Sequence, residues 1–177
     1  MLIALLTLVG LLAALNLLFT YGLVRRLQEY EQRLAALGPA APGQSPGSPA
    51  QGSAVPEFHA VTIDGREVDR ATLAKGDGQI AFFDTDCAPC RERMPGFADF
   101  TAELRSTPIV VVIAGAGAEA ARWAARFGDH VLVVVEERPE LARAFGVDGF
   151  PTMLVLRDGT VEANTATLES LRHFTRA

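Results

Sequence analysis

The sequence contains little cysteine, and this scarcity excludes several classes of protein. Its 177 residues include only two cysteines, Cys87 and Cys90. Two cysteines cannot form the set of disulfides that holds a small secreted scaffold together, and alone they cannot complete a tetrahedral zinc site. The sequence has no second cysteine pair, and its three histidines are scattered. We therefore expect no metal site.

Basic charge is also scarce. The chain has 16 basic and 21 acidic side chains, a formal net charge of −5, and no tract of basic residues. Proteins that bind nucleic acid neutralise phosphates with clustered lysine and arginine. We therefore expect no nucleic-acid partner.

The N-terminal segment lacks charged side chains altogether. Leu2–Val24 is a nearly continuous apolar run within residues 1–24, and about 20 apolar residues in a helix cross the core of a bilayer. A cleaved signal peptide is the alternative, but it would have a basic start and a shorter apolar stretch. The sequence predicts a transmembrane anchor at residues 1–24 that contacts membrane lipid through residues 2–24.

Two further segments precede the folded part of the chain. Residues 25–37 carry an apolar stripe at helical spacing, formed together with the end of the anchor by Leu23, Leu27, Tyr30, Leu34 and Leu37. A stalk of fewer than two heptads is too short for a stable coiled coil, so we expect a helical extension of the anchor, with at most weak pairing of two copies. Residues 38–55 consist almost entirely of Gly, Pro, Ala, Ser and Gln, which predicts a linker.

Residues 56–177 have the pattern of one folded domain, with 13 basic and 19 acidic side chains. Expected strands lie near residues 58–62, 67–68, 80–83, 109–114, 131–135, 152–156 and 161. Expected helices lie near residues 89–105, 118–127, 140–145 and 168–174. Strands that alternate with helices, two of them apolar on both faces, predict an α/β domain with a partly parallel sheet. Hairpins at the start and end of the domain make the expected sheet mixed and add an N-terminal β-hairpin extension.

The chemistry is expected at a Cys-x-x-Cys motif that follows a buried strand and begins a helix. Cys87 would lie at the helix N-terminus, where free amides and the helix dipole favour a thiolate. Cys87 is therefore the candidate nucleophile, and the more buried Cys90 is the candidate resolving thiol. Pro89 at an early helical position loses no hydrogen bond. Half of a zinc site and a pair of structural cysteines are the alternatives, and the strand-to-helix context favours redox chemistry over both.

A second motif, Gly146-Val-Asp-Gly-Phe-Pro-Thr152, directly precedes an expected hairpin strand. Together with the strand–Cys-x-x-Cys–helix unit, it resembles the thioredoxin superfamily over nearly all of residues 56–177. The resemblance implies a thioredoxin-like mixed sheet flanked by helices. It implies that Pro151 is cis and lies against the disulfide, that Phe150 offers backbone groups to a substrate peptide, and that Thr152 starts a central strand.

The segment from Glu57-Phe58 to Asp64-Gly65 and the pair Met94-Pro95 narrow the resemblance. They are similar to the membrane-anchored, extracytoplasmic thioredoxin-like (TlpA-like) reductases, of the cytochrome c maturation type or the methylamine-utilisation accessory type. This resemblance implies the reduction of protein disulfides.

The sequence departs from the pattern of these families at three positions. Asp86 replaces a tryptophan before the first cysteine, Ala81 replaces a buried aspartate, and Arg93 replaces a glutamate. The proton acceptor is therefore unassigned, with Asp84 and Asp86 as candidates because they lie close to the cysteines. Asp86 and Pro89, beside Cys87, are further candidate substrate contacts.

Two patterns disagree on which side of the membrane the domain lies. Arg25 and Arg26 follow the apolar run and no basic residue precedes it, so the positive-inside rule favours the cytoplasm. The resemblance and the long uncharged linker favour the outside. We expect an extracytoplasmic domain on a single-pass membrane protein.

The sequence as a whole predicts a membrane-tethered thiol–disulfide oxidoreductase of the disulfide-reductase type. It needs no dissociable cofactor, because the Cys87–Cys90 pair itself carries the electrons. Its expected partners are a protein client with a disulfide or dithiol and a membrane or soluble redox partner that recycles the pair. The alternative is a redox-inactive thioredoxin-like binding or assembly factor that holds a client in the same groove.

Overall fold

The computed structural model describes Gly10, residues 48–74 and residues 76–175. The predicted anchor and stalk lie outside these residues apart from Gly10, as do residues 38–47 of the predicted linker. Within the described part of the chain, no helix is both long and apolar enough to cross a membrane.

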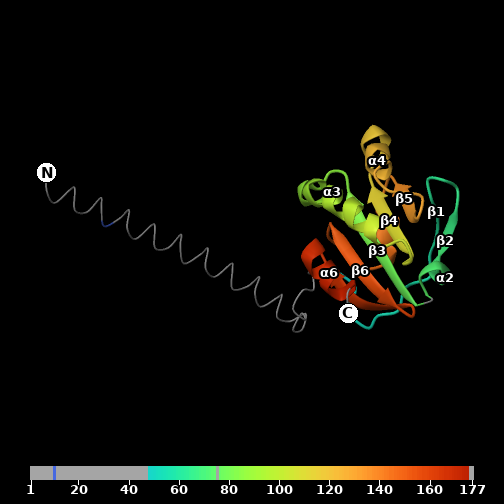
Figure 1. The fold of residues 1–177 in the computed structure, drawn as a ribbon. Helices are drawn as coiled ribbons and strands as arrows, with labels where there is room; N and C mark the ends of the chain where they lie inside the picture. Colours follow the sequence, from blue (N-terminus) through green and yellow to red (C-terminus); the bar gives the residue numbers. More distant parts are fainter. Residues whose placement is uncertain (1–9, 11–47, 75, 176–177) are drawn as a thin grey trace, which may run out of the picture. The chain divides into compact units, whose positions relative to one another are not determined.

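A five-stranded mixed sheet forms the centre of the domain, with strand order β5-β4-β3-β6-β7 (Figure 1). Its strands are β3 (Asp77–Asp84), β4 (Ile109–Ala114), β5 (Val131–Glu136), β6 (Thr152–Arg157) and β7 (Thr160–Thr165). The first three are parallel to one another, whereas β6 is antiparallel to β3 and β7 is antiparallel to β6. Because Thr152 pairs with Phe82, the start of β6 lies at the edge where β3 ends. The expected mixed sheet is confirmed.

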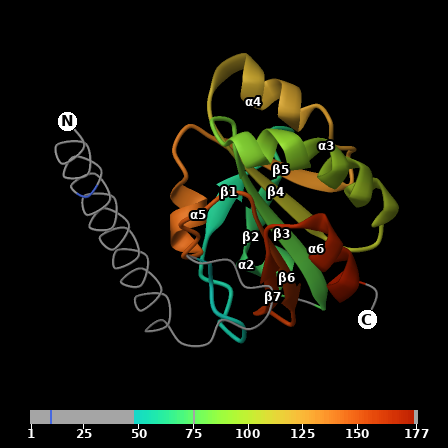
Figure 2. The ribbon, with the colours of Figure 1, turned by 90° about the vertical axis from the view of Figure 1, so that its left-hand side faces the viewer.

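Helices cover both faces of this sheet. One face is covered by α3 (Ala88–Glu103), α4 (Gly117–Ala124) and α6 (Leu168–Thr175). The other face is covered by α2 (Arg70–Leu73), α5 (Glu140–Ala144) and the hairpin of β1 (His59–Val61) and β2 (Glu67–Asp69). Figure 2 shows α3 and α6 in front of the sheet. Successive side chains of β3 point to opposite faces of the sheet, so each face has its own hydrophobic core. Ala81 and Phe83 pack in the core beneath α3, α4 and α6, whereas Ile80 and Phe82 pack in the core on the other face.

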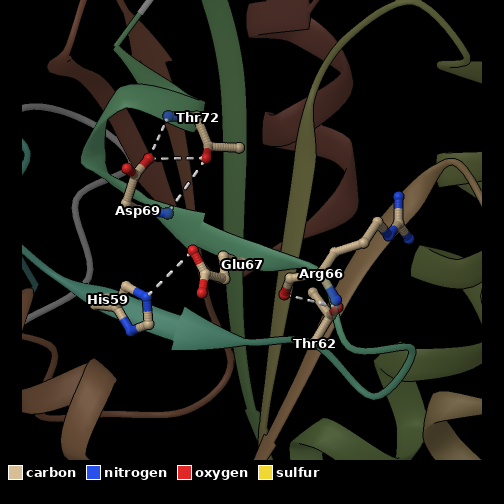
Figure 3. Close-up of polar contacts among 6 residues, drawn as sticks. All are labelled: His59, Thr62, Arg66, Glu67, Asp69 and Thr72. Carbon is tan, nitrogen blue, oxygen red and sulfur yellow. Dashed lines mark hydrogen bonds and ion pairs between the residues drawn. The ribbon is translucent and has the colours of Figure 1, made fainter.

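The N-terminal hairpin, which the sequence predicted, closes the outer edge of β5. The Ile63 amide donates to the Val133 carbonyl oxygen at 2.9 Å. Within the turn, the Arg66 amide donates to the Thr62 hydroxyl at 2.9 Å, as Figure 3 shows. The Arg66 guanidinium reaches the Asp129 carbonyl oxygen at 3.1 Å. An exposed strand edge would offer free amides to other chains, so these bonds protect the sheet.

The short helix α2 was not expected from the sequence. It begins with a reciprocal cap, in which the Thr72 amide donates to Asp69 Oδ1 at 3.0 Å and the Asp69 amide donates to the Thr72 hydroxyl at 3.2 Å (Figure 3). Capping of this kind offsets part of the cost of a one-turn helix.

Residues 48–55, which we call the β7 strap, pack along the outer edge of β7. The Gly52 amide donates to the Val161 carbonyl and the Val161 amide donates to the Ser53 carbonyl, both at 2.8 Å. The Val55 side chain is 1% exposed. The strap belongs to the segment whose composition predicts a linker, and it covers the second open edge of the sheet.

Candidate active site

The two cysteines form a disulfide at the start of α3, just beyond the end of β3. Their Cα atoms are 5.2 Å apart. Cys87 is the N-cap residue of the helix and has an extended backbone, and Pro89 follows in the first turn. Proline fits there because the first amides of a helix have no partner within it. The sequence therefore places the pair where the sheet ends and the helix begins, as expected.

The two sulfur atoms differ in accessibility. Cys90 is 0% exposed and packs in the core with Met94 and Phe97, whereas Cys87 is only partly buried. A protein partner can therefore approach Cys87 but not Cys90. This difference agrees with the burial that the motif predicted.

The surroundings of Cys87 favour an anionic sulfur. The Cys90 amide donates to Cys87 Sγ at 3.2 Å, and Cys87 lies at the N-terminal end of a 16-residue helix. Both the amide and the helix dipole stabilise negative charge on that sulfur.

The second motif lies against the disulfide. The Phe150–Pro151 peptide bond is cis, which confirms the expectation for Pro151. The Phe150 carbonyl oxygen is 3.4 Å from Cys87 Sγ, so the reduced thiol can donate a hydrogen bond to it. Thr152 is the first residue of β6, as expected, and its hydroxyl donates to the Gly149 carbonyl oxygen at 2.8 Å.

The candidate contacts beside the cysteines lie at the surface. Asp86 and Pro89 are both exposed. The Asp86 amide donates to Asp84 Oδ1 at 2.7 Å, which closes the turn between β3 and α3. Both acidic residues therefore lie in the turn that leads to Cys87. Ala81, where the related pattern has a buried aspartate, is 1% exposed within the core.

A close approach between two loops supports this turn. The Thr85 amide donates to the Ala114 carbonyl oxygen at 2.9 Å. Gly115 lies directly against the Thr85 side chain, since a Cβ atom on Gly115 would be 2.1 Å from Thr85 Oγ1. Nothing in the sequence indicated this contact, which joins segments about thirty positions apart.

Charged residues from α3 and α4 also lie near the turn. Arg91 Nη1 donates to the Thr85 carbonyl oxygen at 3.2 Å. On α4, Trp123 Nε1 donates to Glu119 at 2.8 Å, and Arg122 pairs with the same carboxylate. The hydrogen bond from Trp123, together with the charges of Arg122 and Arg91, lowers the pKa of Glu119. Sequence analysis did not identify Glu119, because only the packing of α4 brings it near Arg91.

A half-buried carboxylate lies farther along the same edge of the sheet. Glu136 ends β5, and burial raises its pKa although its oxygens accept the Leu141 amide at 3.2 Å. It lines an open cavity of about 270 Å³ with Glu137, Arg138 and Glu140. In the described residues, no group of three or more His, Cys, Asp or Glu side chains is arranged to hold a metal ion.

Comparison with known proteins agrees with this geometry. The Redoxin family profile matches residues 50–169, which include the β7 strap from Ala50 onward and both cysteines. The thiol-disulfide oxidoreductase ResA of Geobacillus thermodenitrificans is 28% identical over 131 residues, which cover 70% of this chain and 75% of that protein.

Solved structures share the fold. One is a thiol:disulfide interchange protein DsbE from Chlorobium tepidum, with 21% identity, a TM-score of 0.59, and coverage of 73% of this chain and 95% of that one. Another is a secreted disulfide oxidoreductase of Mycobacterium tuberculosis, with 18% identity, a TM-score of 0.54, and coverage of 63% and 84%. The thioredoxin-like fold expected from the motifs is confirmed.

Proposed function

Because this chain belongs to the Redoxin family and is a thiol–disulfide oxidoreductase with a Cys87–Cys90 disulfide, we propose that it reduces disulfides of client proteins outside the cytoplasm, tethered to a membrane by residues 1–24. The observation that carries the reductase role is the contrast between a partly exposed Cys87 at a helix N-terminus and a fully buried Cys90.

The reaction begins from the reduced pair. The Cys87 thiolate attacks one sulfur of the client disulfide, forms a mixed disulfide and expels the other client sulfur as a thiolate, which takes up a proton. Cys90 then loses its proton and attacks the Cys87 sulfur. The Cys87–Cys90 disulfide forms and the second client thiol is released. Two electrons pass to the client, and a dithiol on a redox partner returns the pair to its reduced state.

The loop before β6 is the proposed client-binding surface. The Phe150 carbonyl lies 3.4 Å from Cys87 Sγ, so a client strand bound along Phe150–Thr152 would have its disulfide close to the nucleophile. Asp86 and Pro89 are exposed and lie next to Cys87 in the chain, and we expect them to contact the same client. Main-chain bonds to an extended client would give affinity with little dependence on the client's sequence.

A trapping experiment on the full chain in mild detergent tests this function. The wild type should reduce insulin disulfides with dithiothreitol as the electron source, and Cys87→Ser should abolish the catalysed rate. Cys90→Ser should accumulate a mixed disulfide with the client, because the resolving thiol is missing. Insulin reduction no faster than with Cys87→Ser, together with no trapped client, would instead support a redox-inactive binding or assembly factor.

The proposed location needs a separate measurement. A membrane-impermeant maleimide applied to intact cells that express the reduced protein should label Cys87, with the Cys87→Ser variant as the unlabelled control. Support comes from the secreted relative and from the long uncharged linker. Labelling only after the cells are lysed would place the domain in the cytoplasm, as Arg25 and Arg26 alone would suggest.

A further inference from the structure

The turn between β3 and α3 holds Cys87 in place through the bond of the Cys87 amide to the Asp84 carbonyl oxygen at 3.2 Å and through three further polar contacts of different origin. The Thr85 amide bonds to the neighbouring strand β4 at 2.9 Å, and the Asp86 amide bonds to the Asp84 carboxylate at 2.7 Å. The third contact, from Arg91 Nη1 to the Thr85 carbonyl oxygen at 3.2 Å, comes from the helix and brings a full positive charge.

Arg91 reaches this carbonyl because of its place on the helix. Its amide donates to the Cys87 carbonyl oxygen at 3.2 Å, so Arg91 lies one turn beyond the N-cap. Long side chains on a helix point back toward its N-terminus. The guanidinium is therefore directed over the turn that precedes Cys87, although the Arg91 residue itself is exposed.

The balance of charge around Cys87 gives this contact a chemical consequence. The charged groups on the elements next to Cys87 are Asp84 and Asp86 in the turn, Asp148 in the loop before Pro151, Arg91, Glu92, Arg93, Asp99 and Glu103 on α3, and Glu119 and Arg122 on α4. The two carboxylates of the turn oppose a thiolate, and a nearby cation favours it. On α4, Glu119 is already engaged by Trp123 and Arg122. The charge of Arg91 also acts on Glu119, but the hydrogen bond of its guanidinium goes to the turn.

We propose that Arg91 is a positioning residue for Cys87, which ties the Thr85 carbonyl to helix α3 and holds a positive charge beside the turn that carries the nucleophilic sulfur. The inference rests on the proposed role of Cys87 as the attacking thiolate. Under this proposal, the Cys87 thiolate is stabilised by the charge of Arg91 as well as by the helix N-terminus.

The test is the pH profile of Cys87 alkylation by iodoacetamide in the reduced full chain in detergent. In Arg91→Gln the midpoint should rise by about half a unit to one unit, since a partly exposed charge is screened by water. At a pH below both midpoints, the alkylation rate should therefore fall about threefold to tenfold. Arg91→Lys, which retains the charge, should recover most of this shift.

Arg126→Gln is the matched control, because it removes an exposed arginine beyond the end of α4 and leaves the bonds of Glu119 with Arg122 and Trp123 intact. Its midpoint should stay at the wild-type value. A wild-type midpoint in Arg91→Gln, or an equal shift in Arg126→Gln, would overturn the proposal. Alkylation needs no client, so a shifted alkylation midpoint in Arg91→Gln would support the role of Arg91 even if the protein failed to reduce insulin. The two proposals are therefore tested separately. Urea unfolding of each variant checks that it is folded.

Discussion

At the scale of single residues, the cysteines and Pro151 could be predicted because each belongs to a short local motif. The groups that support them could not. Arg91 bonds to a backbone carbonyl six positions earlier, and Gly115 packs against Thr85 from the loop that follows β4. Neither contact can be predicted from residue type or spacing, because every residue has a backbone carbonyl and glycine is common in turns.

Gly115 provides a sharp residue-scale prediction. Gly115 lies in the loop before α4 and Gly117 is the first residue of that helix. Both have positive φ, +138° and +68°, so alanine at either position costs about 1 kcal/mol in backbone strain. Only at Gly115 does the new Cβ meet Thr85, 2.1 Å from its hydroxyl, which adds about 1–3 kcal/mol of overpacking. Gly115→Ala should therefore destabilise the domain more than Gly117→Ala in urea unfolding, and it should slow insulin reduction. Equal free energies of unfolding for the two variants would contradict this interpretation.

At the scale of elements, hydrophobic periodicity predicted the longer helices and strands, but it did not predict helix α2 or the β7 strap. Helix α3 was expected at residues 89–105 and extends over Ala88–Glu103, because Cys87 caps its start. Helix α2 has four residues, too few for a periodic pattern, although its capping pair, Asp69 and Thr72, was visible in the sequence. The β7 strap could not be predicted from composition, because backbone hydrogen bonds hold it and these do not require an apolar sequence.

The strap leads to an element-scale prediction. Val55→Ala should cost about 2 kcal/mol, because Val55 is 1% exposed and the change removes buried methyl groups and leaves a cavity. Ala54→Ser, at the exposed neighbouring position, should change the free energy of unfolding by less than about 0.5 kcal/mol. Urea unfolding of both variants decides between a structural strap and a passive linker, since a linker would make the two changes equally harmless.

At the scale of the whole molecule, composition predicts an anchor, a stalk and a linker before the domain, and the structure shows that the domain's hydrogen bonds reach back to the strap. Pancreatic elastase, which cuts after small residues, can test where the linker ends. In the full chain it should cut after Ala40, within the predicted linker, but not after Ala54, whose neighbour Val55 donates its amide to the Gly159 carbonyl at 2.9 Å. Mass spectrometry of the released fragment gives the cut site, and equally fast cleavage after Ala54 would show that the strap does not hold. The fragment should contain both cysteines and reduce insulin as the full chain does.

The amino-acid sequence by itself determined the local order: the strand that ends before Cys87, the helix that begins there, and the alternation that gives the sheet two buried faces. These features follow from residues close together in the chain, whose side-chain size, polarity and backbone freedom act over one or two turns. The tertiary structure alone decided which distant groups meet: the Phe150 carbonyl beside Cys87 Sγ, Gly115 against Thr85, Glu119 near Arg91, and the strap along β7. Such contacts depend on strand order and register, which arise only when the whole core packs, because no short segment can bury its apolar face alone.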